Sequence, residues 1–322
     1  FGPGHRKSIP LEEKMKKYAE IGLAGMQFHD DDAVPDMNNM TEKQIIDYAK
    51  DVKAMLDKYG LFAEFVAPRL WFDKRTNDGG FTASRKEDRE FARRSCDIAK
   101  ALGTKKIQLW LAREGTLCAE GKNPVEMTLQ LRDAFNDILT YRDDALILVE
   151  PKPNEPIDRS ICGTAGHALA VGAYTVDPSR VGLCIESAHS ILAGLDPAND
   201  MGFALALNKL WGVHLNDQNG CRYDQDKAFG VDNLRNAFNQ VKVLYENNFG
   251  DRGNFECVGL DVKAMRTQPD DDCYRHLINS KKIFEKLLAK VKRFDYEFQA
   301  ACVKEQNFEK LEMYVMDLLM GD

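Results

Sequence analysis

The sequence predicts an α/β protein that folds as a closed parallel (β/α) barrel. Seven short apolar segments recur along the 322 residues, and segments with apolar residues at helical spacing separate them. Continuous apolar strands that alternate with helices indicate parallel pairing buried on both faces, and the regular repetition favours a barrel. An open doubly wound sheet is the second expectation, because its strands have the same pattern. The expected strands are residues 24–28, 62–67, 106–111, 145–149, 181–185, 210–215 and 255–260.

The segments between these strands carry helix signals. Gly22, Gly60, Gly103 and Asn208 each stand a few residues before an expected strand, where a helix should end in a left-handed cap. Helix ends and strand starts therefore agree. The clearest apolar helical faces are Ile45, Ala49, Val52, Met55 and Leu56, followed by Phe91, Ala92, Cys96, Ile98, Ala99 and Leu102.

After Leu260 the chain becomes helical, charged and amphipathic to its end. These helices exceed what a barrel needs, so we expect a barrel domain at residues 1–285 and a helical C-terminal extension at 286–322. The extension either packs on a neighbouring subunit or caps its own barrel, and the pattern favours neither. No stretch rich in Pro, Gly or Ser divides the chain further.

Composition narrows the functional classes. With 44 Lys and Arg against 51 Asp and Glu, the net charge of −7 argues against nucleic-acid binding. No segment approaches the roughly 18 to 20 apolar residues of a membrane span. We see no signal peptide, and the eight cysteines contain no CxxC pair, so we expect reduced thiols and a cytoplasmic protein. Because the chain opens with Phe1 rather than Met, we expect further residues upstream.

Polar residues follow the expected strands at their C-terminal ends, which in a parallel barrel all open on one face. Each one alone is best explained as a surface carboxylate or a loop histidine with its hydrogen bonds satisfied. Five carboxylates that converge on one barrel mouth would repel one another, so a stable cluster implies compensating cations. The residues concerned are His29, Asp30, Asp31, Asp32, Glu150, Lys152, Glu186, His189, His214, Asn216, Asp224, Asp226, Asp261 and Lys263.

Oxygen and imidazole ligands without thiolate suit Mg²⁺, Mn²⁺ or Co²⁺ better than a structural zinc. Asp224 and Asp226 are two residues apart, so an extended segment would point both toward one ion. Glu186 and His189 are close enough in a loop to serve neighbouring ions. We therefore expect two divalent cations.

Six blocks of the sequence, in family order, resemble xylose isomerase, which is also called glucose isomerase. The resemblance covers nearly the whole chain and is more specific for the superfamily than for the substrate. It implies a (β/α)8 TIM-type barrel whose first strand is missing from this chain. The blocks are residues 28–32 (FHDDD), 78–81 (DGGF), 109–110 (LW) with 113–115 (REG), 150–156 (EPKPNEP), 219–220 (NG) with 223–226 (YDQD), and 261–266 (DVKAMR).

The resemblance also implies roles for individual residues. One metal would be held by Glu150, Glu186, His214 and Asp261. A second would share Glu186 and be held by His189, Asp224 and Asp226. Lys152 would contact the substrate carbonyl, and His29, held by Asp32, would open the sugar ring. The substrate side would be formed by Trp71, Trp110, Lys263 and Asn216, with Phe1 as a weaker match to a residue that the family inserts into its neighbour.

The implied activity is a metal-dependent aldose–ketose isomerisation, a 1,2-hydride shift on an open-chain pentose or hexose. His214 departs from the family, which has an aspartate there. A histidine in this place resembles L-rhamnose isomerase and single-metal sugar epimerases, and it shifts the metal preference from Mg²⁺ toward Mn²⁺, Co²⁺ or Zn²⁺. Cys184 and Ala67 replace polar residues of the family, so we expect a different wall around the far end of the sugar.

Two other functions remain open. One is a single-metal sugar epimerase or glycoside-cleaving enzyme on the same barrel, and the other is a non-catalytic metal-binding subunit. The presence of His189, Asp224 and Asp226 favours the isomerase, because a one-metal mechanism does not need a second ligand set. We expect a small-molecule sugar as substrate and a homo-oligomer, a dimer or a tetramer.

Overall fold

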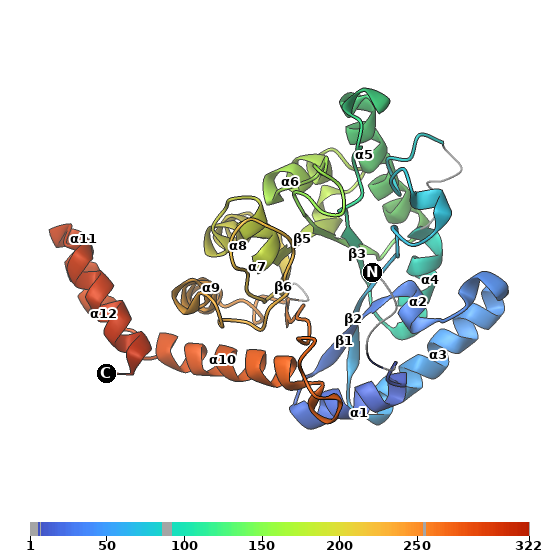
Figure 1. The fold of residues 1–322 in the computed structure, drawn as a ribbon. Coiled ribbons are helices and arrows are strands. Elements are labelled where there is room, and N and C mark those ends of the chain that lie inside the picture. The colour runs from blue at the N-terminus through green and yellow to red at the C-terminus, as the bar shows by residue number, and fades with distance from the viewer. Residues whose placement is uncertain (1–5, 7, 86–91, 254–255, 322) are drawn as a thin grey trace.

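The computed structural model describes residues 6, 8–85, 92–253 and 256–321. Seven parallel strands form one curled sheet in chain order, and helices surround it (Figure 1). The predicted α/β barrel architecture is therefore confirmed, and seven strands fit the expected lack of the family's first strand. The strands are β1 Gly25–His29, β2 Phe62–Ala67, β3 Lys106–Trp110, β4 Leu146–Glu150, β5 Val181–Glu186, β6 Leu210–His214 and β7 Cys257–Gly259.

The strand limits match the expectations to within one or two residues, with the largest difference at β7, which has three residues where 255–260 was expected. Phe1, Phe91 and Phe255, which appeared in our expectations, lie outside the described residues. In the described part of the chain, β1 and β7 are the edges of the sheet. A Cβ added to Gly259 would collide with the Gln27 amide, so the two edges approach each other through this side chain.

Twelve α-helices and five short 3₁₀ segments are described. The helices are α1 Leu11–Ile21, α2 Asp30–Ala33, α3 Glu42–Lys58, α4 Ala92–Leu102, α5 Pro124–Tyr141, α6 Ala165–Ala173, α7 Ser187–Leu192, α8 Pro197–Ala206, α9 Leu234–Glu246, α10 Arg275–Val291, α11 Tyr296–Glu305 and α12 Phe308–Met320. The 3₁₀ segments are Met37–Asn39, Lys74–Thr76, Ala119–Gly121, Pro178–Arg180 and Asp270–Asp272.

Local sequence explains where these helices begin and end. Thr41 and Gln44 form a reciprocal capping box at the start of α3. Pro124 occupies the first turn of α5, where its missing N–H costs nothing. The expected left-handed caps are present, with φ of 80° at Gly22 and 56° at Asn208. These signals fix the ends of the helices and therefore the points at which the following strands can begin.

The main core lies between the sheet and the surrounding helices, with Phe135 of α5 among its largest fully buried side chains. A second, smaller core fills the inside of the barrel and includes Phe65, Leu148 and Trp211. Buried polar groups also occupy the interior. Glu64 accepts a hydrogen bond from Gln27 Nε2 at 2.7 Å and lies 3.3 Å from the Lys106 ammonium.

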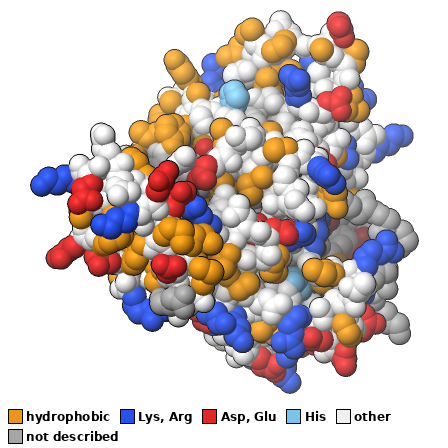
Figure 2. Space-filling view, turned by 60° about the vertical axis from the view of Figure 1, so that its left-hand side comes forward, with side chains coloured by type: hydrophobic (Ala, Val, Ile, Leu, Met, Phe, Trp, Pro, Cys, Tyr) orange, Lys and Arg blue, Asp and Glu red, His pale blue; other side chains and the backbone are white. Residues whose placement is uncertain are grey.

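The helical extension leaves the barrel along α10 and ends in α11 and α12 (Figure 1). It contacts its own chain, since Arg235 of α9 lies 3.2 Å from Glu312, and Phe294 packs edge-on against Tyr314. The predicted boundary at residues 285–286 falls inside α10, and the division into domains stays a prediction, as does packing on a neighbour. Turning this side forward shows apolar side chains mixed with charges of both signs (Figure 2).

Among the described helices, none has the length and apolar character needed to cross a bilayer. All eight cysteines are free.

Candidate metal centre

Three neighbouring strands end in side chains that could hold a cation. β4 ends at Glu150, β5 at Glu186 and β6 at His214. In the sheet register Glu186 lies opposite His214, and Trp110 at the end of β3 lies opposite Glu150. The register of β5 and β6 therefore sets Glu186 beside His214, and a ligand atom of Glu150 lies within 4.8 Å of both at the carboxyl end of the barrel. Each of the three exposes at most 4% of its surface.

Glu186 belongs to two of the sets of ligand atoms that can be formed here. In each set, one ligand atom from every member lies within 4.8 Å of the others. The first set consists of Glu150, Glu186, His214 and Asp261. The second set consists of Glu186, His189 and Asp224. A carboxylate common to two sets is the arrangement that two neighbouring ions require.

Hydrogen bonds orient the carboxylates of the first set. Gln108 donates to Glu150, and Asn216 Nδ2 donates to Glu186 Oε1 at 2.9 Å. The side-chain oxygen of Asn216, Oδ1, in turn accepts a hydrogen bond from the backbone N–H of Ala188 at 2.9 Å. We expected Asn216 on the substrate side, whereas the structure engages it with a candidate ligand. Gln108 was missed, although alternation of polar and apolar residues along β3 indicates that it points into the barrel.

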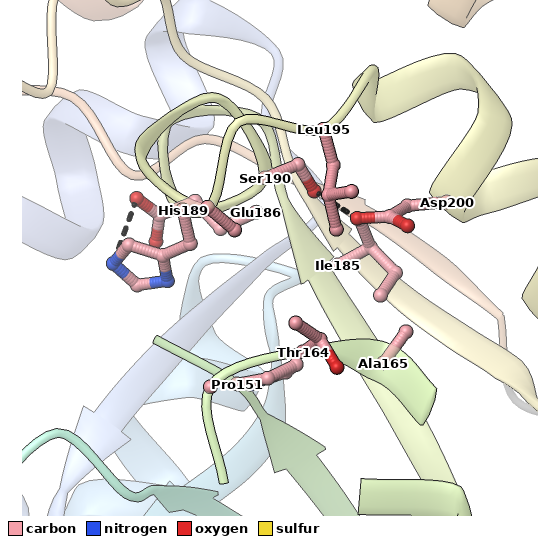
Figure 3. Close-up of a pocket in the computed structure, with 11 residues that line it drawn as sticks. Pro151, Thr164, Ala165, Ile185, Glu186, His189, Ser190, Leu195 and Asp200 are labelled. Carbon is pink, nitrogen blue, oxygen red and sulfur yellow. Dashed lines mark hydrogen bonds and ion pairs between the residues drawn. The ribbon is translucent and has the colours of Figure 1, made fainter. Parts of the chain in front are cut away.

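The imidazoles lie among these carboxylates. His214 Nδ1 is 3.2 Å from Glu150 Oε2 and 3.7 Å from Glu186 Oε2. His189 Nε2 is 3.2 Å from Glu186 Oε1 and 3.3 Å from Asp224 Oδ2. His189 lies on α7 rather than in the expected loop, and its spacing of three residues from Glu186 brings the two side chains together (Figure 3).

Asp226 is the predicted ligand that joins neither set. We expected an extended segment that aims Asp224 and Asp226 at one ion, but Asp226 adopts a left-handed φ of 45°, so strand-like alternation does not apply. Its carboxylate forms an ion pair with Lys263 and accepts a hydrogen bond from Asn216 Nδ2 at 3.2 Å. Lys263, expected to contact substrate, thus lies beside this carboxylate.

The centre contains buried polar atoms that have no hydrogen-bond partner among the described residues. They are Glu186 Oε2, His189 Nδ1, both ring nitrogens of His214, and Asp224 Oδ1. Such atoms are rare in folded proteins and costly when left unpaired. Carboxylate oxygens and imidazole nitrogens are also what a divalent cation binds, so the residues present fit such an ion.

The pKa values of the buried groups are those expected of a cluster that needs additional positive charge. Burial, with the charges of Asp261 and Glu150, raises the pKa of Glu186 well above its usual range. Burial and Asp261 likewise raise the pKa of Asp226 to about 7. Burial acts in the opposite sense on His214, but Cys184 and Glu150 outweigh it and raise the pKa of the imidazole well above its ordinary value. Without a cation, the centre would therefore hold protons.

Lys152 lies beside the second set. Its ammonium is 2.9 Å from Asp224 Oδ2 and 3.3 Å from Glu155 Oε2, and it sits 5.1 Å from the centre of the Trp110 ring. Burial would lower the pKa of Lys152, but the charge of Asp224 dominates and raises it, so the side chain stays cationic. The Lys152 ammonium therefore lies next to the candidate metal ligand Asp224.

Aromatic residues form a wall at the mouth. Trp71 and Trp110 pack edge to face with centroids 4.5 Å apart, and Trp71 contacts the His29 ring at 4.9 Å. His29 Nδ1 lies 3.2 Å from Asp32 Oδ2, the pair expected from the sequence. Arg69, which we did not anticipate, donates to the same carboxylate at 2.9 Å. These contacts bring four of the predicted residues together.

Cys184 and Ala67, expected at the sugar's far end, are both buried inside the barrel. Behind Glu186 and His189 lies a small cavity of about 10 Å³, which is close to the space needed by one water molecule. Ser190 and Asp200 line it and are joined by a 2.7 Å hydrogen bond (Figure 3). Ala67 and the residues that line only this cavity belong to neither ligand set. The Cys184 sulfur lies near Glu150 and His214.

Comparisons with known proteins agree with this architecture. Solved structures of similar fold include a xylose isomerase domain protein from Alicyclobacillus acidocaldarius, at 15% identity and a TM-score of 0.63, with 88% of this chain and 95% of that one covered. Another is the 3-keto-D-glucoside 4-epimerase of E. coli, at 14% identity and a TM-score of 0.63, with 86% and 97% covered. An L-ribulose 3-epimerase matches at 12% identity and a TM-score of 0.64, with 88% and 90% covered. The sequence pattern of the xylose isomerase-like TIM barrel matches residues 15–249. The chain belongs to the xylose isomerase-like TIM barrel family.

Proposed function

We propose that this protein is a divalent-metal-dependent aldose–ketose sugar isomerase that moves a hydrogen between C1 and C2 of an open-chain pentose or hexose. The observation that carries the proposal is the buried carboxylate of Glu186, which is common to two sets of candidate ligands. Several proteins of similar fold are sugar epimerases, which supports a sugar as the substrate.

In this proposal the first ligand set holds one cation and the second set holds another. Asp226 becomes a further ligand of the second ion if it leaves Lys263. Divalent cations in these positions supply positive charge that polarises a substrate carbonyl and lowers the pKa of a hydroxyl. The imidazoles favour Mn²⁺ or Co²⁺ over Mg²⁺.

Lys152 supplies a fixed positive charge from the protein itself. Its ammonium donates to Asp224 and Glu155, and one N–H can be redirected to a substrate oxygen. An ammonium beside an oxygen on which negative charge develops stabilises the transition state more than the ground state. Lys152 therefore assists the movement of hydrogen between the two carbons.

His29 moves the proton that opens the sugar ring. Because Asp32 accepts the hydrogen bond from Nδ1, the other nitrogen, Nε2, is available to exchange a proton with the ring oxygen. Trp71 and Trp110 exclude water from this side of the substrate.

A single-metal sugar epimerase is the second candidate. The ion pair between Asp226 and Lys263 favours it, because this pair leaves the second ligand set with only three members. In that mechanism, protein groups would remove and return a proton instead of guiding a hydride.

The two candidates are separated by running the reaction in D₂O with a panel of aldoses and ketoses and Mn²⁺, Co²⁺ or Mg²⁺. A hydride shift carries the substrate's own hydrogen to the product, so the isomerase proposal predicts no deuterium at C1 or C2. Stereoinversion with deuterium at the inverted carbon would support the epimerase. No conversion of any sugar would contradict both.

Lys152→Met tests the assigned residue. The variant should fold and bind Mn²⁺ but lose roughly 10²- to 10³-fold in kcat, as when one transition-state donor is removed. Lys209→Met is the matched control, because Lys209 binds the carbonyls of Pro178 and Val181 at the opposite end of the barrel. A rate for Lys152→Met close to that of the control would show that Lys152 is structural.

A further inference from the structure

A thiol lies directly under the candidate metal centre. Cys184 is on β5, two residues before Glu186, and exposes 1% of its surface. Its sulfur and one ligand atom each of Glu150 and His214 lie within 4.8 Å of one another. These three residues come from β4, β5 and β6, and all are buried. They form a third ligand set, which we name the lower set.

A second observation points to a ligand in this place. Both ring nitrogens of His214 are buried and have no hydrogen-bond partner among the described residues. The residue exposes only 4% of its surface, so water does not replace the missing partner. A metal-binding histidine normally donates its other N–H to a carboxylate, carbonyl or water. The 3.2 Å approach to Glu150 does not give a hydrogen bond of acceptable geometry. The ring is therefore held in the barrel without the contacts that would satisfy it.

The backbone leaves room for the sulfur. Residue 212, which lies opposite Cys184 in the sheet register, is glycine. A Cβ at this position would lie 3.4 Å from Cys184 Sγ, in van der Waals contact with the sulfur. Gly212 thus leaves the thiol unobstructed from the side of β6.

We propose that Cys184 is a metal ligand, and that Glu150, Cys184 and His214 hold a cation deeper in the barrel than the oxygen-rich first set does. This inference rests on the proposed function, since it requires that the centre binds a cation. Sulfur and imidazole favour Co²⁺ and Zn²⁺, whereas oxygen ligands favour Mg²⁺. The identity of the ion would therefore decide how deep it sits.

The two sets share Glu150 and His214, so one ion can occupy either position. A Mg²⁺ ion would be held with Glu186 and Asp261 near the mouth. A Co²⁺ or Zn²⁺ ion would move toward Cys184. In this arrangement two overlapping ligand sets distinguish between metals, and no separate second site is needed.

Cobalt absorption tests the proposal without sugar turnover. A thiolate bound to Co²⁺ gives a charge-transfer band in the near ultraviolet that carboxylate and imidazole ligands do not give. The full chain would carry Cys118→Ser and Cys221→Ser, because these two exposed cysteines could bind added Co²⁺. We expect one equivalent of Co²⁺ to produce the band in this parent.

Cys184→Ser should abolish the band and lower Co²⁺ affinity by about 10- to 100-fold, while Mg²⁺ affinity stays unchanged. Cys162→Ser is the matched control, because Cys162 is equally buried but belongs to none of the ligand sets in the described chain. It should keep the band. Thermal unfolding of both variants checks that they fold.

Three results would overturn the inference. Co²⁺ binding measured by calorimetry without a thiolate band would exclude Cys184 as a ligand and leave the proposed isomerase intact. Absence of Co²⁺, Mn²⁺ and Mg²⁺ binding would overturn both proposals together. A band that survives in Cys184→Ser would assign it to another cysteine.

Discussion

Glu186→Gln should make the ion-free protein more stable and remove its response to metal. Glutamine keeps the shape of the side chain and its contact with Asn216 but removes the charge. The ligand atoms of Glu150 and Asp261 lie within 4.8 Å of Glu186. Two like charges 4.8 Å apart repel each other by about 3.5 kcal/mol at an effective dielectric constant of about 20.

The gain should depend on pH in a defined direction. Because burial and neighbouring carboxylates raise the pKa of Glu186, its protonated form stabilises the fold at low pH, and this contribution is lost as the pH rises through the raised value. Glutamine cannot lose this contribution. The variant should therefore match the parent in acid and exceed it at higher pH, with each kcal/mol shifting Tm by about 2–4 °C.

Metal should stabilise the parent far more than the variant. Mn²⁺ at about 100 times its Kd should stabilise the parent by roughly 2.7 kcal/mol, and Glu186→Gln should lose most of this gain because both ligand sets lose a member. Scanning calorimetry with EDTA or with Mn²⁺ measures both effects.

Glu64→Gln is the control for a buried carboxylate inside the same barrel. Glu64 is paired with Lys106, so neutralising it leaves a buried ammonium without its counter-charge and should cost about 3–5 kcal/mol. Its response to Mn²⁺ should remain. If Glu186→Gln is as unstable as Glu64→Gln, or still responds fully to Mn²⁺, the assignment of Glu186 to a cation centre is refuted.

Three further outcomes follow from the structure. His214→Asp should raise the affinity for Mg²⁺ relative to Mn²⁺, and an unchanged ratio in calorimetric titrations would place His214 outside the ligands. The rise in Tm caused by Mn²⁺ should grow from about pH 5 to about pH 8, because protons compete for Glu186 and for Asp226, whose pKa is raised to about 7; a constant rise would contradict this. Phe135→Ala should cost about 3–5 kcal/mol in urea unfolding, whereas Leu129→Ala on the exposed side of α5 should cost less than about 0.5 kcal/mol, and equal losses would disprove the assigned core.

Most of the barrel could be predicted from local sequence. The apolar segments predicted all seven strands to within two residues at each end, because apolar residues dominate strands that are buried on both faces. Glycine caps such as Gly22 and Gly103 predicted the helix ends, since a left-handed φ strongly favours glycine. The length of β7 was the least well predicted, because this strand has only three residues and is partly exposed.

The level of the candidate site was also predictable, because strand ends in a parallel barrel share one face. The pairing of side chains within it was not. Asp226 pairs with Lys263 because of its left-handed backbone, and Arg69, in the loop after β2, reaches Asp32 of α2. Both contacts depend on loop conformation, which residue spacing does not specify.

The buried pair of Glu64 and Lys106 limits how far an ion can travel into the barrel. A Cβ on Gly212 would lie 3.4 Å from Cys184 Sγ and 3.6 Å from Glu64 Oε1, so the thickness of one glycine separates the lower ligand set from this pair. Beyond Cys184 lies the Glu64 carboxylate, whose charge is already balanced by the ammonium of Lys106, and the Trp211 carbonyl holds this ammonium at 3.0 Å. A carboxylate that is already paired offers little attraction to a second cation, and the ammonium repels it. Ions would then enter and leave by the mouth, and the residues that line it, including Lys152 and Trp110, would set the rate of metal exchange.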